Sequence, residues 1–202
     1  MRRLALYVRV SERLHSEGQQ WVSSYGLAEL THTGDAQVRR DLLIIGAKGT
    51  RGAGYALETL IAALRTTLGR GEQRRVYVVG AGKMGLALSR YANLGHGAFR
   101  VIGLFDSDKH KIGVRYGDLV VRDAREVGRC AVRERPHLAV IATPAKQAQQ
   151  VADSLVSSGI AGILNFAPVP LKVPSRVYVQ NVDLLVELEL VAFRVTHRQS
   201  LP

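Results

Sequence analysis

The sequence of 202 residues contains a single cysteine, Cys130, which excludes an internal disulfide framework. Its six histidines are scattered, and no group of cysteines and histidines has the spacing of metal ligands, so we expect no structural metal. No apolar run approaches the roughly 20 residues that cross a bilayer. The first residues, Met1 to Arg9, are basic and amphipathic and lack the apolar core of a signal peptide. We therefore expect a cytoplasmic protein that does not enter a membrane.

Acidic residues are also few. The chain has 17 of them against 28 lysines and arginines, which gives a formal net charge of +11. Such an excess favours an anionic partner, nucleic acid above all, and the alternative is a basic protein with a uniformly solvated surface. The length suffices for one large domain or two modest ones. Net charge bears on association and not on fold, so the fold and the function must be inferred from the sequence motifs.

The main motif is a set of three glycines that follows a short apolar run. Residues 76–79 predict a buried strand, and Gly80, Gly82 and Gly85 follow it at the spacing G-x-G-x-x-G. Gly80 would allow a tight turn, and Gly82 would let backbone N–H groups approach a pyrophosphate at a helix N-terminus. Gly85 would let the following helix pack close to the sheet. An isolated match of this kind also fits a plain tight turn. The neighbouring residues are therefore needed to distinguish a nucleotide-binding turn from a plain one.

The residues after the glycines supply that context. Residues 86–94 have helical spacing of apolar residues, and 101–105 predict a strand that ends in Asp106, twenty-one residues past Gly85. A carboxylate at this place binds the adenosine ribose and favours NAD(H) over the phosphorylated form, a preference that Lys109 tempers. Lys83, inside the turn, either helps to bind the pyrophosphate or caps a solvated edge. The turn also adds Ala81 and Met84 to the candidate cofactor site.

The second half of the chain alternates apolar strands with helical patterns, as expected of a parallel sheet with helices on both faces. We expect strands at 138–141, 160–165 and 177–179 and a helix at 145–157. In such sheets the carboxyl ends of the strands line the ligand crevice. The loops there would surround the far end of a dinucleotide, and they add these residues to the candidate cofactor site: Thr143, Pro144, Asn165, Phe166 and Ala167.

The N-terminal part predicts three helices, at 4–14, 23–30 and 35–43. Ser23 or Ser24 would cap the second helix, and Leu27 and Leu30 would face inward. The third helix would bury one apolar face and turn polar and basic side chains outward. A helix, a short turn with glycine and a basic helix are the helix-turn-helix arrangement.

A glycine-rich segment follows these helices. Residues 46–55 contain four glycines and two cations, and they predict a loop or hairpin able to lie along a phosphate backbone, or else a solvated linker. A connecting helix is expected at 56–68, with a boundary at 69–71. At the other end of the chain, 181–193 predict a last helix capped by Asn181. That helix is too apolar to stand in water, so it packs on this chain or on a second copy.

Taken together, these segments resemble the Rex family of redox-sensing transcriptional repressors. The resemblance lies in residues 22–24, 37–42, 49–55, 105–108 and 165–169 and in the glycine turn. It implies an α/β chain with an N-terminal winged helix-turn-helix domain (1–70), a doubly wound Rossmann domain that binds NADH and NAD⁺ (71–180), and a C-terminal helix and tail exchanged between subunits (181–202). It further implies a homodimer that binds double-stranded operator DNA and leaves it when NADH binds.

The resemblance also implies roles for single residues. The expected DNA contacts are Ser23, Ser24, Gln37, Arg39, Arg40, Lys48 and Arg51. Tyr91 is similar to the residue near the nicotinamide that takes part in the switch, and Arg9 and Asp183 resemble the charged pair that couples the first helix to the partner's exchanged helix. The segment 43–45 departs from the family, since Leu-Ile-Ile replaces a more polar and aromatic sequence.

Two other functions fit the glycine turn. A small NAD-dependent oxidoreductase needs a proton donor beside the nicotinamide, yet no tyrosine is followed by lysine four residues on. His96, His110 and His137 have no paired acid or nucleophile at a readable spacing, so we interpret them as surface or packing residues and expect no enzyme. A CoA-binding Rossmann module shares the turn but does not explain the helix-turn-helix.

Overall fold

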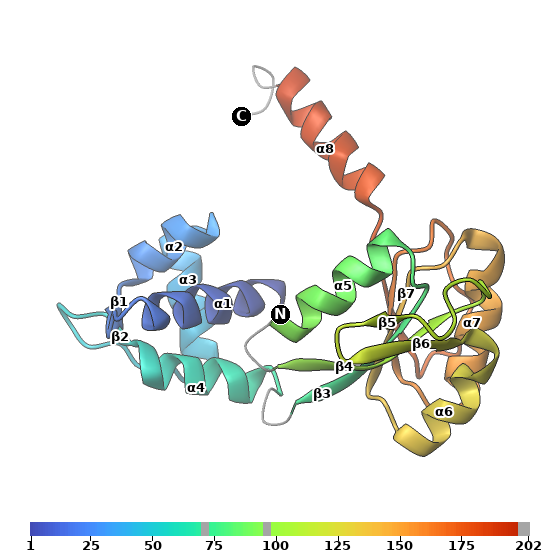
Figure 1. Ribbon diagram of the computed structural model, residues 1–202. Helices are drawn as coiled ribbons and strands as arrows, with labels where there is room; N and C mark the ends of the chain where they lie inside the picture. The colour runs from blue at the N-terminus through green and yellow to red at the C-terminus, as the bar shows by residue number, and fades with distance from the viewer. Residues whose placement is uncertain (70–72, 95–97, 198–202) are drawn as a thin grey trace. The chain divides into compact units, whose positions relative to one another are not determined.

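The computed structural model describes residues 1–69, 73–94 and 98–197. The chain divides into two compact units, residues 1–72 and 73–202, which are described one at a time (Figure 1). Three expectations fall wholly or partly outside the described residues: the boundary at 69–71, the role of His96, and the end of the tail from residue 198.

The first unit packs its helices around one apolar core, in which Tyr7, Leu27, Leu42 and Leu64 are fully buried. Each helix contributes one face to this core, as the spacing of apolar residues predicts. The predicted helices are therefore confirmed, with ends shifted by one or two residues. The elements are α1 (Arg2–Ser16), β1 (Trp21–Val22), α2 (Ser24–Thr31), α3 (Asp35–Ile44), β2 (Tyr55–Ala56) and α4 (Leu57–Thr67).

Helices α2 and α3 form the helix-turn-helix. The Oγ of Ser23 accepts a hydrogen bond at 2.9 Å from the backbone N–H three residues on, so Ser23 and not Ser24 caps α2. Leu27 is buried as predicted, but Leu30 is 43% exposed and Ala28 is buried instead. At about 100° per residue, Leu30 lies about 110° from the middle of the arc that Leu27 and Ala28 bury. The prediction for Leu30 is therefore wrong.

The glycine-rich segment after α3 is a hairpin. The N–H of Thr50 donates to the carbonyl oxygen of Gly54 at 2.6 Å, and β2 then pairs antiparallel with β1, with Tyr55 opposite Val22. Gly54 has a φ of 91°, and a Cβ there would lie 2.4 Å from the carbonyl oxygen of Val22, so only glycine fits. Because this hairpin follows the two helices and is tied to the sheet, the first unit is a winged helix-turn-helix, and the linker alternative is wrong.

The second unit is built on a parallel sheet. Over residues 73–197 as described, its strand order is β5-β6-β4-β3-β7-β8-β9, and only β5 runs antiparallel to its neighbour. The first strand, β3, lies at the centre, and the order reverses between β3 and β7, which places a crevice at their carboxyl ends. The strands are β3 (Arg74–Val79), β4 (Phe99–Asp106), β5 (Arg115–Tyr116), β6 (Leu119–Asp123), β7 (Leu138–Ile141), β8 (Gly162–Asn165) and β9 (Tyr178–Asn181).

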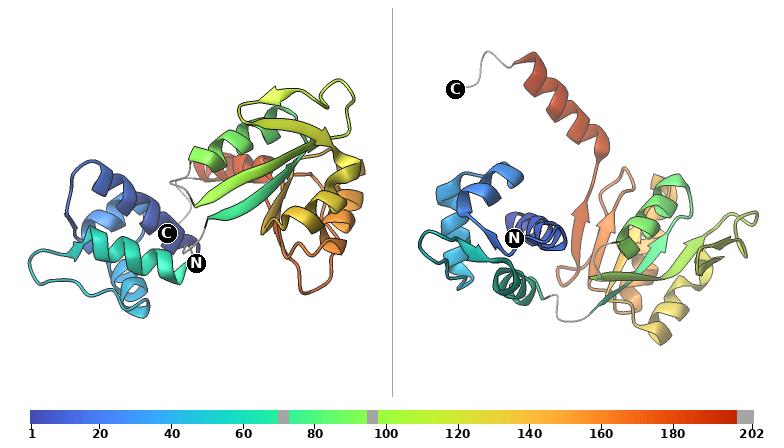
Figure 2. Two further views of the ribbon diagram at one scale, coloured as in Figure 1. Left: turned by 60° about the horizontal axis from the view of Figure 1, so that its bottom comes forward. Right: turned by 60° about the vertical axis from the view of Figure 1, so that its left-hand side comes forward.

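Helices cover both faces of this sheet, as predicted for a doubly wound fold. α5 (Lys83–Leu94) packs on one face, and α6 (Val127–Glu134) and α7 (Ala145–Ser157) pack on the other (Figures 1 and 2). Successive residues of a strand point to opposite faces. Val76 and Val78 therefore join the core under α5, while Tyr77 and Val79 join the core under α6 and α7. Burial on both sides explains the unbroken apolar run of β3.

Two boundaries near the C-terminus differ from the predictions. β9 continues to Asn181, whose backbone is paired with Asn165, so Asn181 belongs to the sheet and does not cap the last helix. The cap of α8 (Leu184–Thr196) is Asp183, whose Oδ1 accepts a hydrogen bond from the N–H of Leu185 at 2.9 Å. A carboxylate here satisfies a free N–H group and also faces the positive end of the helix dipole.

Helix α8 is exposed along its whole length. Leu185 is 70% exposed and Leu188 is 64% exposed, and Figure 2 shows the helix standing clear of the sheet of its own unit. Within the described part of its own unit the helix is therefore not buried, and its packing on a second copy stays a prediction. Within the described ranges, the helices are all too short or too polar to span a membrane.

Candidate functional site

A cavity of about 470 Å³ opens at the carboxyl ends of β3, β4 and β7. This is the place where doubly wound sheets bind ligands. Five residues predicted for the cofactor site line it, namely Gly80, Gly82, Asp106, Thr143 and Pro144. Four polar residues outside the predicted cofactor set line it as well: Ser107, Asp108, Lys111 and Gln147.

The three glycines have the separate roles that their spacing predicts. Gly80 has a φ of 107°, and a Cβ there would lie 2.3 Å from the carbonyl oxygen of Ala142, so the turn passes against the loop after β7. A Cβ on Gly85 would lie 1.7 Å from the carbonyl oxygen of Gly80, so the start of α5 packs directly on the turn. At Gly82 a Cβ would meet nothing within 4 Å, which leaves open space for a ligand against the backbone.

Asp106 lies at the end of β4 and is 9% exposed. Its Oδ2 accepts hydrogen bonds from the N–H of Ala81 at 2.8 Å and from Nζ of Lys111 at 3.0 Å, and its Oδ1 accepts one from the N–H of Asp108 at 2.9 Å. A carboxylate offers about four acceptor positions, so about one remains for a ribose hydroxyl. The cation in contact with Asp106 is Lys111, whereas Lys109 is exposed and is not among the residues that line the cavity, so its role stays a prediction.

The charge state of Asp106 follows from these contacts. Burial by itself would raise the pKa of Asp106, but the hydrogen bonds from Asp108, Lys111 and Ala81 outweigh it and hold the pKa below its usual value. Asp106 is therefore a carboxylate at neutral pH and repels a second phosphate at the ribose.

Thr143 and two helix ends complete the cavity. The Oγ1 of Thr143 is buried and has no hydrogen-bond partner in the described part of the chain. A buried hydroxyl without a partner destabilises the fold unless a ligand or a water molecule forms a hydrogen bond with it. α5 begins at Lys83 beside the glycine turn, and α7 begins after Pro144 without a side-chain cap. Uncapped helix N-termini attract anions. The cavity thus offers donors for phosphates, an acceptor for a ribose and an unused hydroxyl, which fits a dinucleotide.

Several predicted cofactor residues lie outside this cavity. Lys83 and Met84 are exposed on the first turn of α5, and the N–H of Ala81 is bonded to Asp106. The contacts described for Lys83 do not distinguish between its two predicted roles, which are binding the pyrophosphate and capping a solvated edge. Tyr91 is 60% exposed and lies two turns farther along α5, about 12 Å from Lys83 along the helix axis.

The loop after β8 forms a separate site. Asn165 is 1% exposed, and its amide is used within the fold, since Oδ1 accepts from the N–H of Ala167 at 3.0 Å and Nδ2 donates to the carbonyl oxygen of Val169 at 2.8 Å. Asn165 therefore shapes the loop that carries Phe166. A second cavity of about 240 Å³ lies here, lined by Ala167 and by Asp183 at the base of α8.

The predicted DNA contacts occupy α3 and the wing. Arg39 and Arg40 are exposed on α3, and Lys48 and Arg51 are exposed on the wing. Arg39 is paired with Asp35 on the same helix. The two serines lie at the start of α2, where the hydroxyl of Ser23 is used as the cap, and Gln37 is half-buried on α3.

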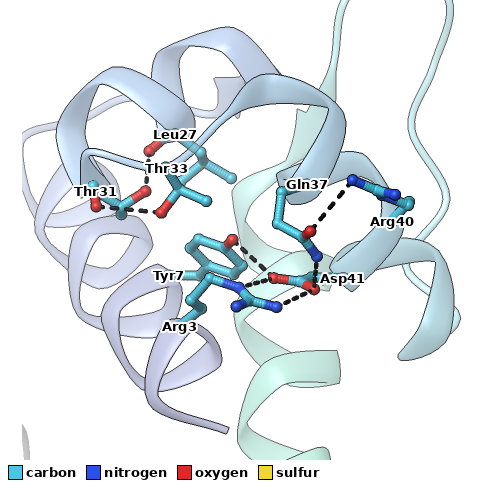
Figure 3. A network of polar contacts seen from close by, with 8 residues as sticks. All are labelled: Arg3, Tyr7, Leu27, Thr31, Thr33, Gln37, Arg40 and Asp41. Carbon is cyan, nitrogen blue, oxygen red and sulfur yellow. Dashed lines mark hydrogen bonds and ion pairs between the residues drawn. The ribbon is translucent and has the colours of Figure 1, made fainter. Parts of the chain in front are cut away.

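Asp41 is a polar centre that sequence reasoning missed. It is 8% exposed on α3 and accepts hydrogen bonds from Arg3 and Tyr7 of α1 and from Gln37 (Figure 3). The pair with Arg3 lowers the pKa of Asp41 far below its usual value. Arg3 and Tyr7 share one face of α1, and Gln37 and Asp41 share one face of α3, because each pair is four residues apart. The sequence does not show that these two faces meet.

The residues expected to couple the two ends of the chain lie in different units. Arg9 is exposed on α1, and Asp183 caps α8. Each side chain is thus available at a surface of its own unit.

Comparison with known proteins gives the same division. The profile of the family described as "Putative DNA-binding protein N-terminus" matches residues 1–42, and that of the "CoA binding domain" matches residues 71–169. The redox-sensing transcriptional repressor Rex of Pelotomaculum thermopropionicum is 39% identical over 198 residues, which cover 98% of this chain and 93% of the relative. Rex 1 of Thermotoga maritima is 40% identical over 200 residues, 98% of this chain and 95% of the relative.

Solved structures agree over the same length. The crystal structure of RSP, a Rex-family repressor, has a TM-score of 0.85 at 32% identity and covers 98% of this chain and 93% of that one. RSP in complex with beta-NAD⁺ and operator DNA has a TM-score of 0.87 at 33% identity, covering 98% of this chain and 91% of that one, and RSP in complex with beta-NADH is also similar. The chain described here belongs to the Rex family of redox-sensing transcriptional repressors.

Proposed function

We propose that this chain is a transcriptional repressor that reads the ratio of NADH to NAD⁺. It binds double-stranded operator DNA through α3 and the wing, and it leaves the DNA when NADH fills the cavity of the second unit. The observation that carries the proposal is the presence, in one chain, of a dinucleotide cavity and a winged helix-turn-helix. The similarity to RSP supports both partners, because RSP has been crystallised with beta-NADH and with beta-NAD⁺ and operator DNA.

The residues of the cavity have defined tasks in this proposal. The backbone at Gly82 and the first turn of α5 bind the pyrophosphate, and Asp106 accepts a hydrogen bond from the adenosine ribose. Thr143 and Pro144 lie toward the nicotinamide end, where Phe166, Ala167 and Tyr91 enclose the ring in the dimer. NADH and NAD⁺ differ only in that ring, which is neutral when reduced and carries a positive charge when oxidised. An apolar enclosure therefore favours the reduced form, because burying an unpaired charge is costly.

A homodimer follows from the composition of α8. Its exposed apolar residues lie on most sides of the helix: Leu184, Leu185, Val186, Leu188, Leu190, Val191, Phe193 and Val195. Glu187 and Arg194 share the remaining side, so the helix is apolar over most of its circumference. A helix with so wide an apolar surface is not stable in water, and we infer that it inserts between elements of a second copy. Exchange of this helix makes three functional segments, residues 1–70 for DNA, 71–180 for the nucleotide and 181–202 for the partner. A dimer also presents two α3 helices to two half-sites of a palindromic operator.

The switch requires two arrangements of the dimer with different affinities for NADH, because a ligand that binds both equally shifts nothing. We infer that enclosure of the reduced ring favours a closed arrangement and moves Tyr91. Arg9 of one subunit and Asp183 of the other then exchange ionic partners. The distance between the two α3 helices then no longer matches the distance between successive major grooves, and the operator is released.

Catalysis is not part of the proposal. An oxidoreductase needs a proton donor beside the nicotinamide, and the described lining of the main cavity includes no histidine, tyrosine or cysteine. Tyr91, which the proposal places at the ring, is assigned to the switch and is not followed by the lysine four residues on that a catalytic tyrosine would need. A CoA-binding module would use the same fold but would leave the winged helix-turn-helix without a role. A protein that reads operator DNA works beside the chromosome, so we place it in the cytoplasm.

Binding to a palindromic duplex, followed by fluorescence anisotropy, tests the proposal. The protein alone or with NAD⁺ is expected to bind the duplex, and NADH is expected to release it in a saturable manner. Equal binding with and without NADH would contradict the switch, and turnover of NADH with a small carbonyl substrate would support the oxidoreductase.

A further inference from the structure

A buried carboxylate beside the DNA-reading face has all its acceptor positions filled. Oδ1 of Asp41 accepts from Nη2 of Arg3 at 2.9 Å and from Nε2 of Gln37 at 2.7 Å. Oδ2 accepts from Nε of Arg3 at 2.6 Å and from the hydroxyl of Tyr7 at 3.0 Å (Figure 3). Because a carboxylate offers about four such positions, none is left for DNA. Asp41 therefore acts only through the groups that it holds.

The group it holds on the DNA-reading helix is the amide of Gln37. A carboxylate only accepts hydrogen bonds, so the NH₂ group of Gln37 must face Asp41 and its Oε1 must face away. Nη2 of Arg40 lies 3.3 Å from that Oε1, which agrees with this orientation because a guanidinium only donates. Two interactions thus select one of the two ways in which the amide can lie.

The selected orientation determines which hydrogen-bonding groups Gln37 can offer to a base. The bond to Asp41 uses one amide hydrogen, and the second hydrogen and Oε1 remain for another partner. One donor beside one acceptor matches the N7 acceptor and N6–H₂ donor that adenine presents in the major groove. Arg3 and Tyr7 fix Asp41 from α1, so two helices determine which edge of Gln37 faces outward.

We propose that Asp41 is a positioning residue for operator reading, which holds the amide of Gln37 in the orientation that reads an adenine. The inference rests on the proposed function, since it needs a protein that binds operator DNA. Without Asp41 the amide can turn over and exchange its donor and acceptor. The preference for adenine should then fall, while contacts to phosphates stay as they are.

The test compares Asp41→Asn with the control Glu58→Gln, which removes one negative charge from an exposed position on α4 of the same unit. A duplex is selected from a random pool with the parent protein, and each base pair is then replaced in turn. The parent is expected to prefer adenine at one position of each half-site by about tenfold. Asp41→Asn should reduce that preference below about threefold with an unchanged salt dependence, and Glu58→Gln should retain it.

The outcomes separate the two proposals. If the parent binds every duplex alike, the proposed function fails, and this inference fails with it. If the parent selects a duplex and Asp41→Asn keeps the full preference, or if Glu58→Gln loses it equally, only the role of Asp41 is overturned. Thermal unfolding shows whether Asp41→Asn still folds. If it does not, Gln37→Glu decides, because glutamate offers no donor while the pair of Arg3 and Asp41 remains, and a retained adenine preference in that variant would overturn the inference.

Discussion

Asp106 has about one acceptor position left for a ribose hydroxyl, because Ala81, Asp108 and Lys111 use the others. Asp106→Ala removes that position and a buried charge partner of Lys111. We expect NADH binding to weaken by about 1–3 kcal/mol, the usual cost of a lost buried hydrogen bond to a charged group. Operator binding without ligand should be unchanged. Calorimetry with NADH measures the effect, with Asp118→Asn, an exposed carboxylate in the same unit, as the control. Unchanged NADH affinity would remove Asp106 from the site.

Sequence reasoning located Asp106 because a carboxylate at the end of a strand after a glycine turn has a fixed place in this fold. The sequence pointed to Lys109, three residues after Asp106, whereas the cation in contact with the carboxylate is Lys111, five residues after it. Only the turn after β4 decides between them, by bringing Nζ of Lys111 to 3.0 Å from Asp106. Asp41 was missed for a related reason. Its partners on α1 are more than 30 residues away, and their approach depends on how α1 packs on α3.

Glu134 gives a test of stability against pH. It joins three elements, since Arg122 of β6 donates to both of its oxygens at 2.8 and 3.1 Å and the hydroxyl of Tyr77 of β3 donates at 2.5 Å. Arg122 lowers the pKa of Glu134 to about 2. A lowered pKa means that the contribution to the free energy of unfolding is present above the unfolded pKa, near 4.3, and is lost as the pH falls toward 2.

Glu134→Gln should therefore be less stable than the parent at neutral pH and should lose less stability between pH 4.5 and 2.5. Urea unfolding across this range measures both. Glu126→Gln, a mostly exposed carboxylate just before α6, serves as the control. Parallel pH profiles for the parent and Glu134→Gln would contradict the role of this contact.

At the scale of elements, the strands and helices with strong periodicity were predictable, and the segment between β4 and β7 was not. β5 has two residues, and β6 has one buried residue, Val121, and no long apolar run. Such short elements are defined by pairing with β4 and by packing of α6, which the local sequence does not encode. The cap of α8 was misplaced because Asn181 and Asp183 are both good caps, and the pairing of Asn181 with Asn165 removes it from that role.

Helix α8 is predicted to hold the dimer together. Leu188→Asp places a charge on the helix where the partner should cover it, and loses roughly 1.5–3 kcal/mol of apolar burial for each subunit. We expect this variant to have the mass of a monomer by light scattering, whereas the parent should be a dimer. Glu189→Gln, the neighbouring change, should leave the mass as in the parent. A dimer that persists in Leu188→Asp would show that α8 is not the interface.

The wing is predicted to contribute a phosphate contact. Arg51 is exposed and lies at the tip of the hairpin. Each phosphate that a protein neutralises adds about 0.9 to the slope of log affinity against log salt concentration. Arg51→Ala should therefore lower the magnitude of that slope by about 0.9 without changing base preference. Arg115→Ala, in the second unit, is the control, and an identical slope for parent and Arg51→Ala would exclude the contact.

At the scale of the whole molecule, the two units have separate cores and separate ligands, so the account depends on coupling between them. The sequence could indicate both units, because each carries its own local patterns. It could not show the coupling, which depends on how two copies of the chain are arranged. Coupling through a dimer is a difference in free energy and is therefore reciprocal.

The most direct measurement of the central claim is this reciprocity. NADH affinity is measured by calorimetry with and without saturating operator DNA, and operator affinity is measured by anisotropy with and without saturating NADH. The account predicts that NADH weakens DNA binding by the same factor by which DNA weakens NADH binding, typically about 5–150-fold, and that NAD⁺ gives a much smaller factor. Affinities that do not change, or equal factors for NADH and NAD⁺, would contradict a redox-responsive repressor.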